Sequence, residues 1–148
     1  MMHEHTSRLS LANLWVAFAT FLLAALMGLY QVAERSGMFP SIENIELYYR
    51  SVSSHGVIMG FVLTTFFIIG FGYWISHTTL KIPLWGGTKL GWIGFIIGFG
   101  GTAMAALMLL MGDASVMYTF YPPLRANPIF YMGAALLVVG SWVWCLQM

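Results

Sequence analysis

The 148-residue chain is 59% hydrophobic and 7% charged, with a net charge of +1 and a mean hydropathy of +0.81. Soluble domains usually have about a quarter of their residues charged, so this composition excludes a water-facing globular surface and predicts a protein embedded in lipid. The near-neutral charge and the lack of a lysine–arginine run exclude a nucleic-acid-binding surface. A single cysteine, Cys145, excludes an internal disulfide.

Apolar runs of sufficient length for membrane-spanning helices occur at residues 11–32, 51–76, 91–112 and 128–148. A helix needs about 20 residues to cross a hydrocarbon core of about 30 Å. The first run lacks a small-residue cleavage site, so it is interpreted as a retained span rather than a signal peptide. The pattern predicts an all-α transmembrane fold in a single membrane domain, residues 1–148.

The placement of charge says little about orientation. Lys and Arg divide evenly between the two sides: Arg8, Lys81 and Lys89 against Arg35, Arg50 and Arg125. Most acidic residues lie on the second side, which favours a cytoplasmic N-terminus. The fourth run reaches Met148 with no polar flank, which suggests a fragment or one piece of a split subunit.

His55 lies in the stretch "YYRSVSSHGVIMGFV", about one turn inside the second run. An ionisable side chain in a span is costly and generally faces the bundle interior with a partner. A neutral imidazole has one nitrogen lone pair, which suits a transition metal or haem iron. Gly56, next to it, leaves room for a flat macrocycle. The alternative is a histidine hydrogen-bonded to backbone or to a hydroxyl such as that of Ser51 or Ser54.

The other histidines have simpler interpretations. His77, beside Tyr73 and Trp74, is typical of an aromatic belt at the membrane surface. His3 and His5 belong to a polar terminus. The eleven methionines are expected to fill apolar space rather than to bind copper, since no Met-x-Met cluster occurs.

Small residues predict close helix contacts. Gly56 and Gly60 form one such pair, and the third run has a row of them: Gly91, Gly94, Gly98, Gly100, Gly101 and Thr102. Residues 118–131, "YTFYPPLRANPIFY", contain two consecutive prolines and predict a stiff, non-helical connection. The aromatic residues around these prolines are expected to cap the membrane surface.

Together these stretches resemble the N-terminal part of subunit I of the haem-copper terminal oxidases. The motifs are "SSHGVIMGFV" (53–62), "FGYW" (71–74) and "YPPL" (121–124). The fuller match of "YYRSVSSHG", "ASVMYTFYPPL" and "FYMGAALLVVGSWV" is most similar to the B family, or ba-type oxidases. The polar ladder that A-family enzymes use for proton uptake is missing from the third run, which agrees with this assignment.

The resemblance implies a four-helix N-terminal part of the subunit I bundle, in which His55 is an axial ligand of low-spin haem b. It implies a multi-pass protein in the plasma membrane of a prokaryote, with a cytoplasmic N-terminus. Cytochrome c or quinol would supply electrons through a copper-bearing subunit II, in respiratory electron transfer to oxygen coupled to proton translocation. Tyr118, Phe120 and Tyr121 would lie near the haem edge and the oxygen route.

The family's second axial histidine, high-spin haem ligand, copper histidines and cross-linked tyrosine have no counterpart in these residues. The remaining spans of subunit I would supply them, with the high-spin haem and copper, so the chain alone lacks the oxygen-reducing centre. Two alternatives stay open: a subunit of a related nitric oxide reductase, and a non-catalytic four-span accessory membrane protein.

Overall fold

The computed structural model describes residues 2–38, 45–117 and 119–148, of which 2–5 as backbone only. The helices are α1 (Met2–Arg35), α2 (Ile45–Val57), η1 (Ile58–Leu63), α3 (Thr64–Ile75), η2 (Ser76–Leu80), α4 (Gly87–Met111) and α5 (Pro128–Gln147). From α2 to η2 the helix is continuous, and η1 and η2 are π-helical. The described residues contain no strand, only an isolated bridge between Ala114 and Ala126.

Four helices are long and apolar enough to cross a membrane: Thr6–Arg35, Ile45–Leu80, Gly87–Met111 and Pro128–Gln147. The predicted all-α transmembrane fold is therefore confirmed. The second helix begins at Ile45, before the apolar run that starts at residue 51. Within this added stretch, Glu46 and Arg50, one turn apart, form an ion pair of 2.6 Å.

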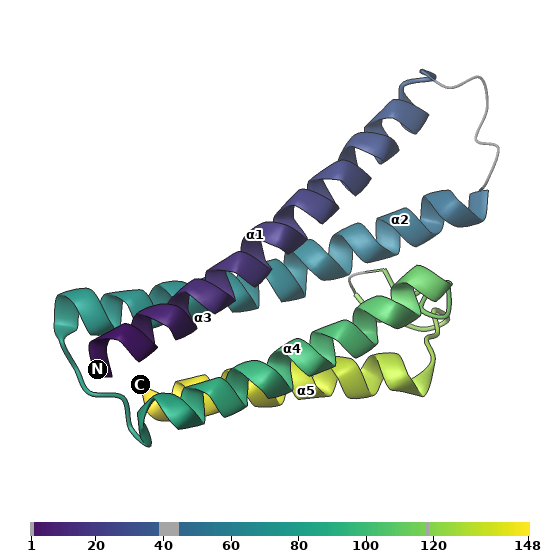
Figure 1. Cartoon of the computed structure of the whole chain (residues 1–148). Coiled ribbons are helices and arrows are strands. Elements are labelled where there is room, and N and C mark those ends of the chain that lie inside the picture. Colours follow the sequence, from purple (N-terminus) through teal and green to yellow (C-terminus); the bar gives the residue numbers. More distant parts are fainter. Residues whose placement is uncertain (1, 39–44, 118) are drawn as a thin grey trace.

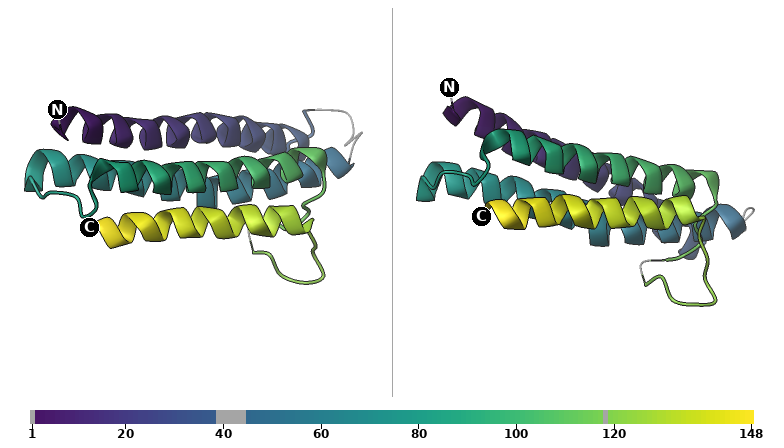
Figure 2. Two further views of the ribbon diagram at one scale, coloured as in Figure 1. Left: turned by 60° about the horizontal axis from the view of Figure 1, so that its bottom comes forward. Right: turned by 90° about the horizontal axis from the view of Figure 1, so that it is seen from below.

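The helices form two neighbouring pairs (Figure 1). In one pair α1 crosses the α2–η1–α3 helix, and in the other α4 runs beside α5. Both chain termini lie at one end of the bundle, together with the connection between η2 and α4 (Figure 2). The connection between α4 and α5 lies at the opposite end, which also holds the N-terminal half of α2.

Glycines bring α4 and α5 together. A Cβ atom added at Gly101 would lie 2.5 Å from the carbonyl oxygen of Gly133, and one at Gly133 would lie 2.5 Å from that of Gly101. A Cβ at Gly94 would lie 3.3 Å from the Gly140 oxygen. The predicted packing face on the third span is confirmed at these positions, but Gly100 faces open space.

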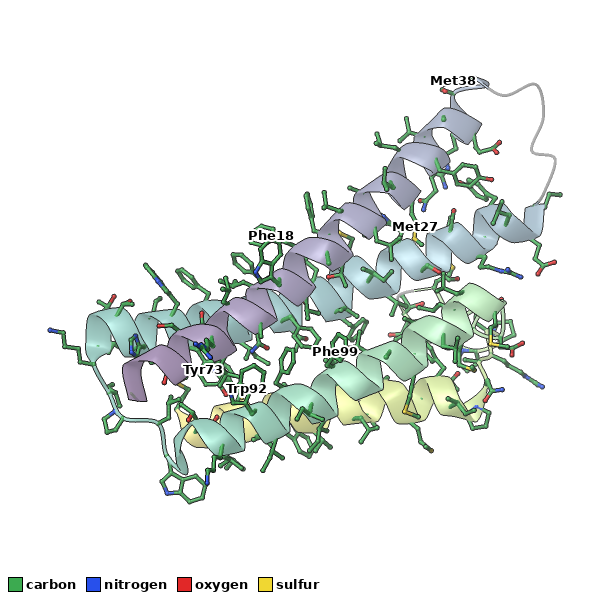
Figure 3. All side chains as sticks on the ribbon, viewed as in Figure 1. Phe18, Met27, Met38, Tyr73, Trp92 and Phe99 are labelled. Carbon is green, nitrogen blue, oxygen red and sulfur yellow. The ribbon has the colours of Figure 1, made fainter. Side chains whose placement is uncertain are left out.

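A buried polar group joins α3, α4 and α5 near the termini. The Tyr73 hydroxyl donates to Gln147 Oε1 at 2.6 Å, and Gln147 Nε2 donates to the carbonyls of Trp85 and Gly87 at 3.0 and 2.9 Å. Figure 3 shows Tyr73 and Trp92 between the α1–α3 pair and α4. Tyr73 is only 2% exposed and Trp74 is 49% exposed, so of these two aromatic neighbours of His77 only Trp74 faces outward; the belt position of His77 itself stays a prediction.

Candidate functional site

The His55 imidazole projects from α2 toward α1. Its Nδ1 lies 2.8 Å from the backbone carbonyl oxygen of Ala24. Because a carbonyl can only accept a hydrogen bond, Nδ1 carries the proton and donates it. The neutral ring then has its lone pair on Nε2, which is the nitrogen available to a metal.

The close approach of this ring to α1 depends on Gly28. A Cβ atom at Gly28 would lie 3.1 Å from His55 Cε1 and 3.4 Å from Nδ1. Ala24 and Gly28 are one turn apart, so one supplies the acceptor and the other the space. Neither residue was identified from the sequence, although the spacing of two small residues in "AALMG" is a recognisable signal.

The structure bears out one part of the alternative considered for His55, a hydrogen bond to backbone, and does not show the other part, a hydrogen bond to the hydroxyl of Ser51 or Ser54. The Ser51 hydroxyl donates to the Tyr48 carbonyl at 2.7 Å, and Ser54 is 2% exposed. The imidazole is hydrogen-bonded to the Ala24 carbonyl of α1 rather than to one of these hydroxyls. One ring nitrogen is thus oriented by backbone, and this arrangement is the common one for metal-bound histidines.

The π-helical segment η1 begins just beyond His55. Thr64 Oγ1 donates to the Gly60 carbonyl at 2.7 Å within this distorted stretch. A Cβ at Gly60 would meet no atom within 4 Å, so the helix contact predicted for Gly56 and Gly60 is not present at Gly60. Gly56 itself is partly buried next to His55. Its predicted role in making room for a macrocycle stays a prediction.

Phe120 in the 112–127 connection packs against the helix that carries His55. Its ring stacks on Phe61 of η1 at a centroid distance of 5.2 Å and meets the edge of Phe130 of α5 at 5.5 Å. These three rings line an apolar cavity of about 220 Å³ between η1, α4 and α5. The structure thus brings Phe120, but not His55, to this cavity.

Of the other two aromatic candidates, the structure describes only Tyr121, which does not contact this cluster. The Tyr121 side chain is 72% exposed and has no ring contact with another described residue. Tyr118 lies outside the described residues. The "YPPL" connection therefore contributes a packed Phe120 and an exposed Tyr121, and the predicted site roles of all three aromatic residues remain predictions.

His77 lies far from His55 on the same helix. The two are 22 residues apart, which corresponds to roughly 30 Å at about 1.5 Å per residue. Within the described part of the chain, no three His, Cys, Asp or Glu side chains are grouped closely enough to hold a metal ion. The side chains of His3 and His5 fall outside the description.

These residues fit one axial position of a haem. The imidazole is oriented, its Nε2 lone pair is not engaged by the Ala24 contact, and the ring is only partly buried. A haem held by two histidines needs a second imidazole on the opposite face of the iron. His77 lies at the other end of the same helix and cannot reach that face.

Comparison with known proteins identifies the family of the chain. Residues 8–148 match the family described as Cytochrome C and Quinol oxidase polypeptide I. The chain is 30% identical over 135 residues to cytochrome c oxidase subunit 1 of Thermus thermophilus, a match that covers 86% of this chain and 24% of that protein.

A solved structure shares the helix arrangement. A cryo-EM structure of a heme-copper terminal oxidase dimer superposes with a TM-score of 0.85 at 39% identity, covering 93% of this chain and 24% of that one. The chain thus spans about a quarter of the length of the relatives that it matches. With nearly all of its residues inside the family match, the chain belongs to the cytochrome c and quinol oxidase polypeptide I family, the haem-copper oxidase subunit I proteins.

Proposed function

We propose that this chain supplies His55 as one axial ligand of the low-spin haem b in subunit I of a terminal oxidase. The observation that carries the proposal is the 2.8 Å contact between His55 Nδ1 and the Ala24 carbonyl. It fixes the tautomer in which Nε2 has the lone pair, and a hydrogen bond of this kind also raises the basicity of a metal-bound imidazole.

The neighbouring residues orient and admit the ring. Gly28 lets the imidazole lie against α1, and Ala24, 0% exposed, keeps water from competing for the Nδ1 proton. Gly56, next in sequence, leaves space for the porphyrin plane. When bound, the haem supplies one-electron redox chemistry, and the chain's own part is to hold one ligand in a fixed orientation.

The proposal extends to the residues around the connection between α4 and α5. Phe120 lines the apolar cavity with Phe61 and Phe130. A nonpolar cavity of about 220 Å³ is large enough for a small apolar gas molecule. Phe120, with Tyr118 and Tyr121 beside it in sequence, would then lie on the oxygen route near the haem edge.

The remaining parts of the reaction require partners. The second axial histidine, the high-spin haem and the copper would come from the remaining spans of subunit I. A copper-bearing subunit II would pass electrons from cytochrome c or quinol, and reduction of oxygen would be coupled to proton translocation. We place the assembly in the plasma membrane of a prokaryote, with the N-terminus of this chain in the cytoplasm.

Oxygen is the acceptor that the comparisons favour. The relatives that match are named as oxidases. Since the chain belongs to the oxidase family, the accessory-protein alternative loses its support.

The test is a His55→Ala substitution in the complete oxidase that contains this chain. We expect the low-spin haem b band to disappear from the reduced-minus-oxidised absorbance spectrum, because one axial ligand is lost. His77→Ala is the matched control and should retain the band, since His77 is at the other end of the helix. An unchanged low-spin spectrum in His55→Ala would remove the ligand assignment.

A further inference from the structure

A second cavity lies at the opposite end of the bundle from the Phe120 cluster. It has a volume of about 210 Å³ and is formed where α1, η2 and the start of α4 meet (Figure 2). Its lining residues are Thr6, His77, Lys81, Ile82, Pro83, Leu84, Gly87 and Thr88. The proposed haem ligand is elsewhere, so this cavity serves no part of the function described above.

The chemistry of the cavity favours an anion. Lys81 lines it, and no ion pair of Lys81 is recorded among the described residues. No Asp or Glu occurs between Glu46 and Asp113, so η2, the following connection and α4 contribute no carboxylate. These elements therefore bring no acidic side chain to Lys81; on α1, which also forms the cavity, the acidic residue nearest in sequence is Glu4, two positions before the lining residue Thr6.

The backbone adds further donors. Helix α4 begins at Gly87 on the cavity wall, and no side chain caps its N-terminus at Gly86. The first amides of a helix lack intrahelical acceptors and attract negative charge. The Gly87 amide donates to the Leu84 carbonyl at 3.0 Å, and Thr88 adds a hydroxyl to the same wall. The cavity thus offers a cation, a hydroxyl and the positive end of a helix together.

The surroundings of Lys81 indicate where the anion comes from. Leu80 and Ile82, on either side of it, are 56% and 54% exposed, and Trp85 is 68% exposed. Large apolar side chains flanking a lysine at the end of a transmembrane helix are typical of the interface between lipid tails and head groups. A soluble phosphate would gain nothing from these side chains, whereas a phospholipid would place its acyl chains along them.

We propose that this cavity binds the phosphate head group of an anionic phospholipid. Lys81 and the start of α4 contact the phosphate, Thr88 donates a hydroxyl, and Leu80, Ile82 and Trp85 contact the tails. Basic pockets between transmembrane helices are known to select anionic lipids in this way. The lipid would fasten the end of η2 to α4 at the membrane surface.

The experiment measures retained and added lipid by native mass spectrometry of the complete oxidase, titrated with phosphatidylglycerol and, separately, with phosphatidylcholine. We expect one saturable phosphatidylglycerol site, and Lys81→Gln should weaken it about five-fold, the usual effect of one lysine near an anionic lipid. Lys89→Gln is the matched control, since Lys89 is a nearby lysine outside the cavity lining, and it should bind as the unmodified protein does.

Thr88→Val tests the site without a change of charge and should also weaken binding. The low-spin haem spectrum should be unchanged in all three variants, which separates this proposal from the haem assignment. Equal loss in Lys81→Gln and Lys89→Gln would show general surface attraction and overturn the proposal. Equal binding of phosphatidylcholine, or full displacement by inorganic phosphate, would overturn the assignment to an anionic lipid.

Discussion

A methyl group added at Gly28 tests the proposed haem ligand without replacing His55 itself. In Gly28→Ala the new Cβ would stand 3.1 Å from His55 Cε1 and 3.4 Å from Nδ1. The first of these distances is tighter than ordinary van der Waals contact, so the ring must move away by a few tenths of an ångström. The movement pushes the imidazole away from α1 and from its hydrogen-bond acceptor.

The size of the effect follows from the 2.8 Å bond to Ala24. A displacement of a few tenths of an ångström lengthens this bond to about the limit of 3.2 Å for an N–H···O bond. Overpacking of this kind costs about 1–3 kcal/mol, and the weakened hydrogen bond adds about 0.5–1.5 kcal/mol. Loss of a partner that orients a metal ligand typically lowers metal affinity about 10–100-fold.

The assay is a spectroscopic and redox titration of low-spin haem b in the purified oxidase. We expect Gly28→Ala to shift the midpoint potential and lower haem occupancy, and Gly28→Val to do both more strongly. Gly100→Ala is the control, because a Cβ there meets nothing within 4 Å. If Gly28→Val left the low-spin spectrum and potential equal to those of Gly100→Ala, the orienting role of the α1 contact would be refuted.

Three further predictions concern the packing and the polar contacts of the helices. Tyr73→Phe removes the buried hydroxyl that donates to Gln147 Oε1 and should destabilise the protein by about 1–3 kcal/mol in a thermal unfolding assay. The control Tyr131→Phe should not, because the Tyr131 side chain is 43% exposed. Gly101→Ala should lower the unfolding temperature more than Gly100→Ala, since its Cβ would lie 2.5 Å from the Gly133 carbonyl oxygen; equal temperatures would contradict the close contact. Glu46→Gln breaks an exposed ion pair and should change the unfolding free energy by less than about 1 kcal/mol.

The spans were predictable because lipid imposes a simple constraint. Every backbone polar group in a bilayer must be satisfied internally, so a long uncharged run has few structures open to it other than a helix. The helix ends were less predictable. The second helix begins at Ile45, before the apolar run, because a helix can extend beyond the hydrocarbon core, where hydropathy does not report it; Glu46 and Arg50 pair on this added stretch.

In the candidate site, His55 could be identified from the sequence, but the residues of α1 that contact it could not. His55 stands out because an ionisable residue in an apolar run is rare and costly. Its partners do not stand out, since Ala24 contributes only a backbone carbonyl and Gly28 only the lack of a side chain. The spacing of these two small residues signals a close helix contact, but which turn of α1 faces His55 is set by how the two helices cross.

The π-helical segment η1 shows why the contact between Phe61 and Phe120 could not be predicted from the sequence pattern either. A π turn holds more residues than an α turn, so the side chains that follow are rotated relative to an unbroken α-helix. Phe61 lies within this segment and stacks on Phe120 at 5.2 Å, while His55, before it, faces α1. An α-helical period carried on from His55 would turn Phe61 to a different direction. One continuous helix, with this change of helix type just beyond His55, thus presents an imidazole to α1 and an aromatic ring to the connection after α4.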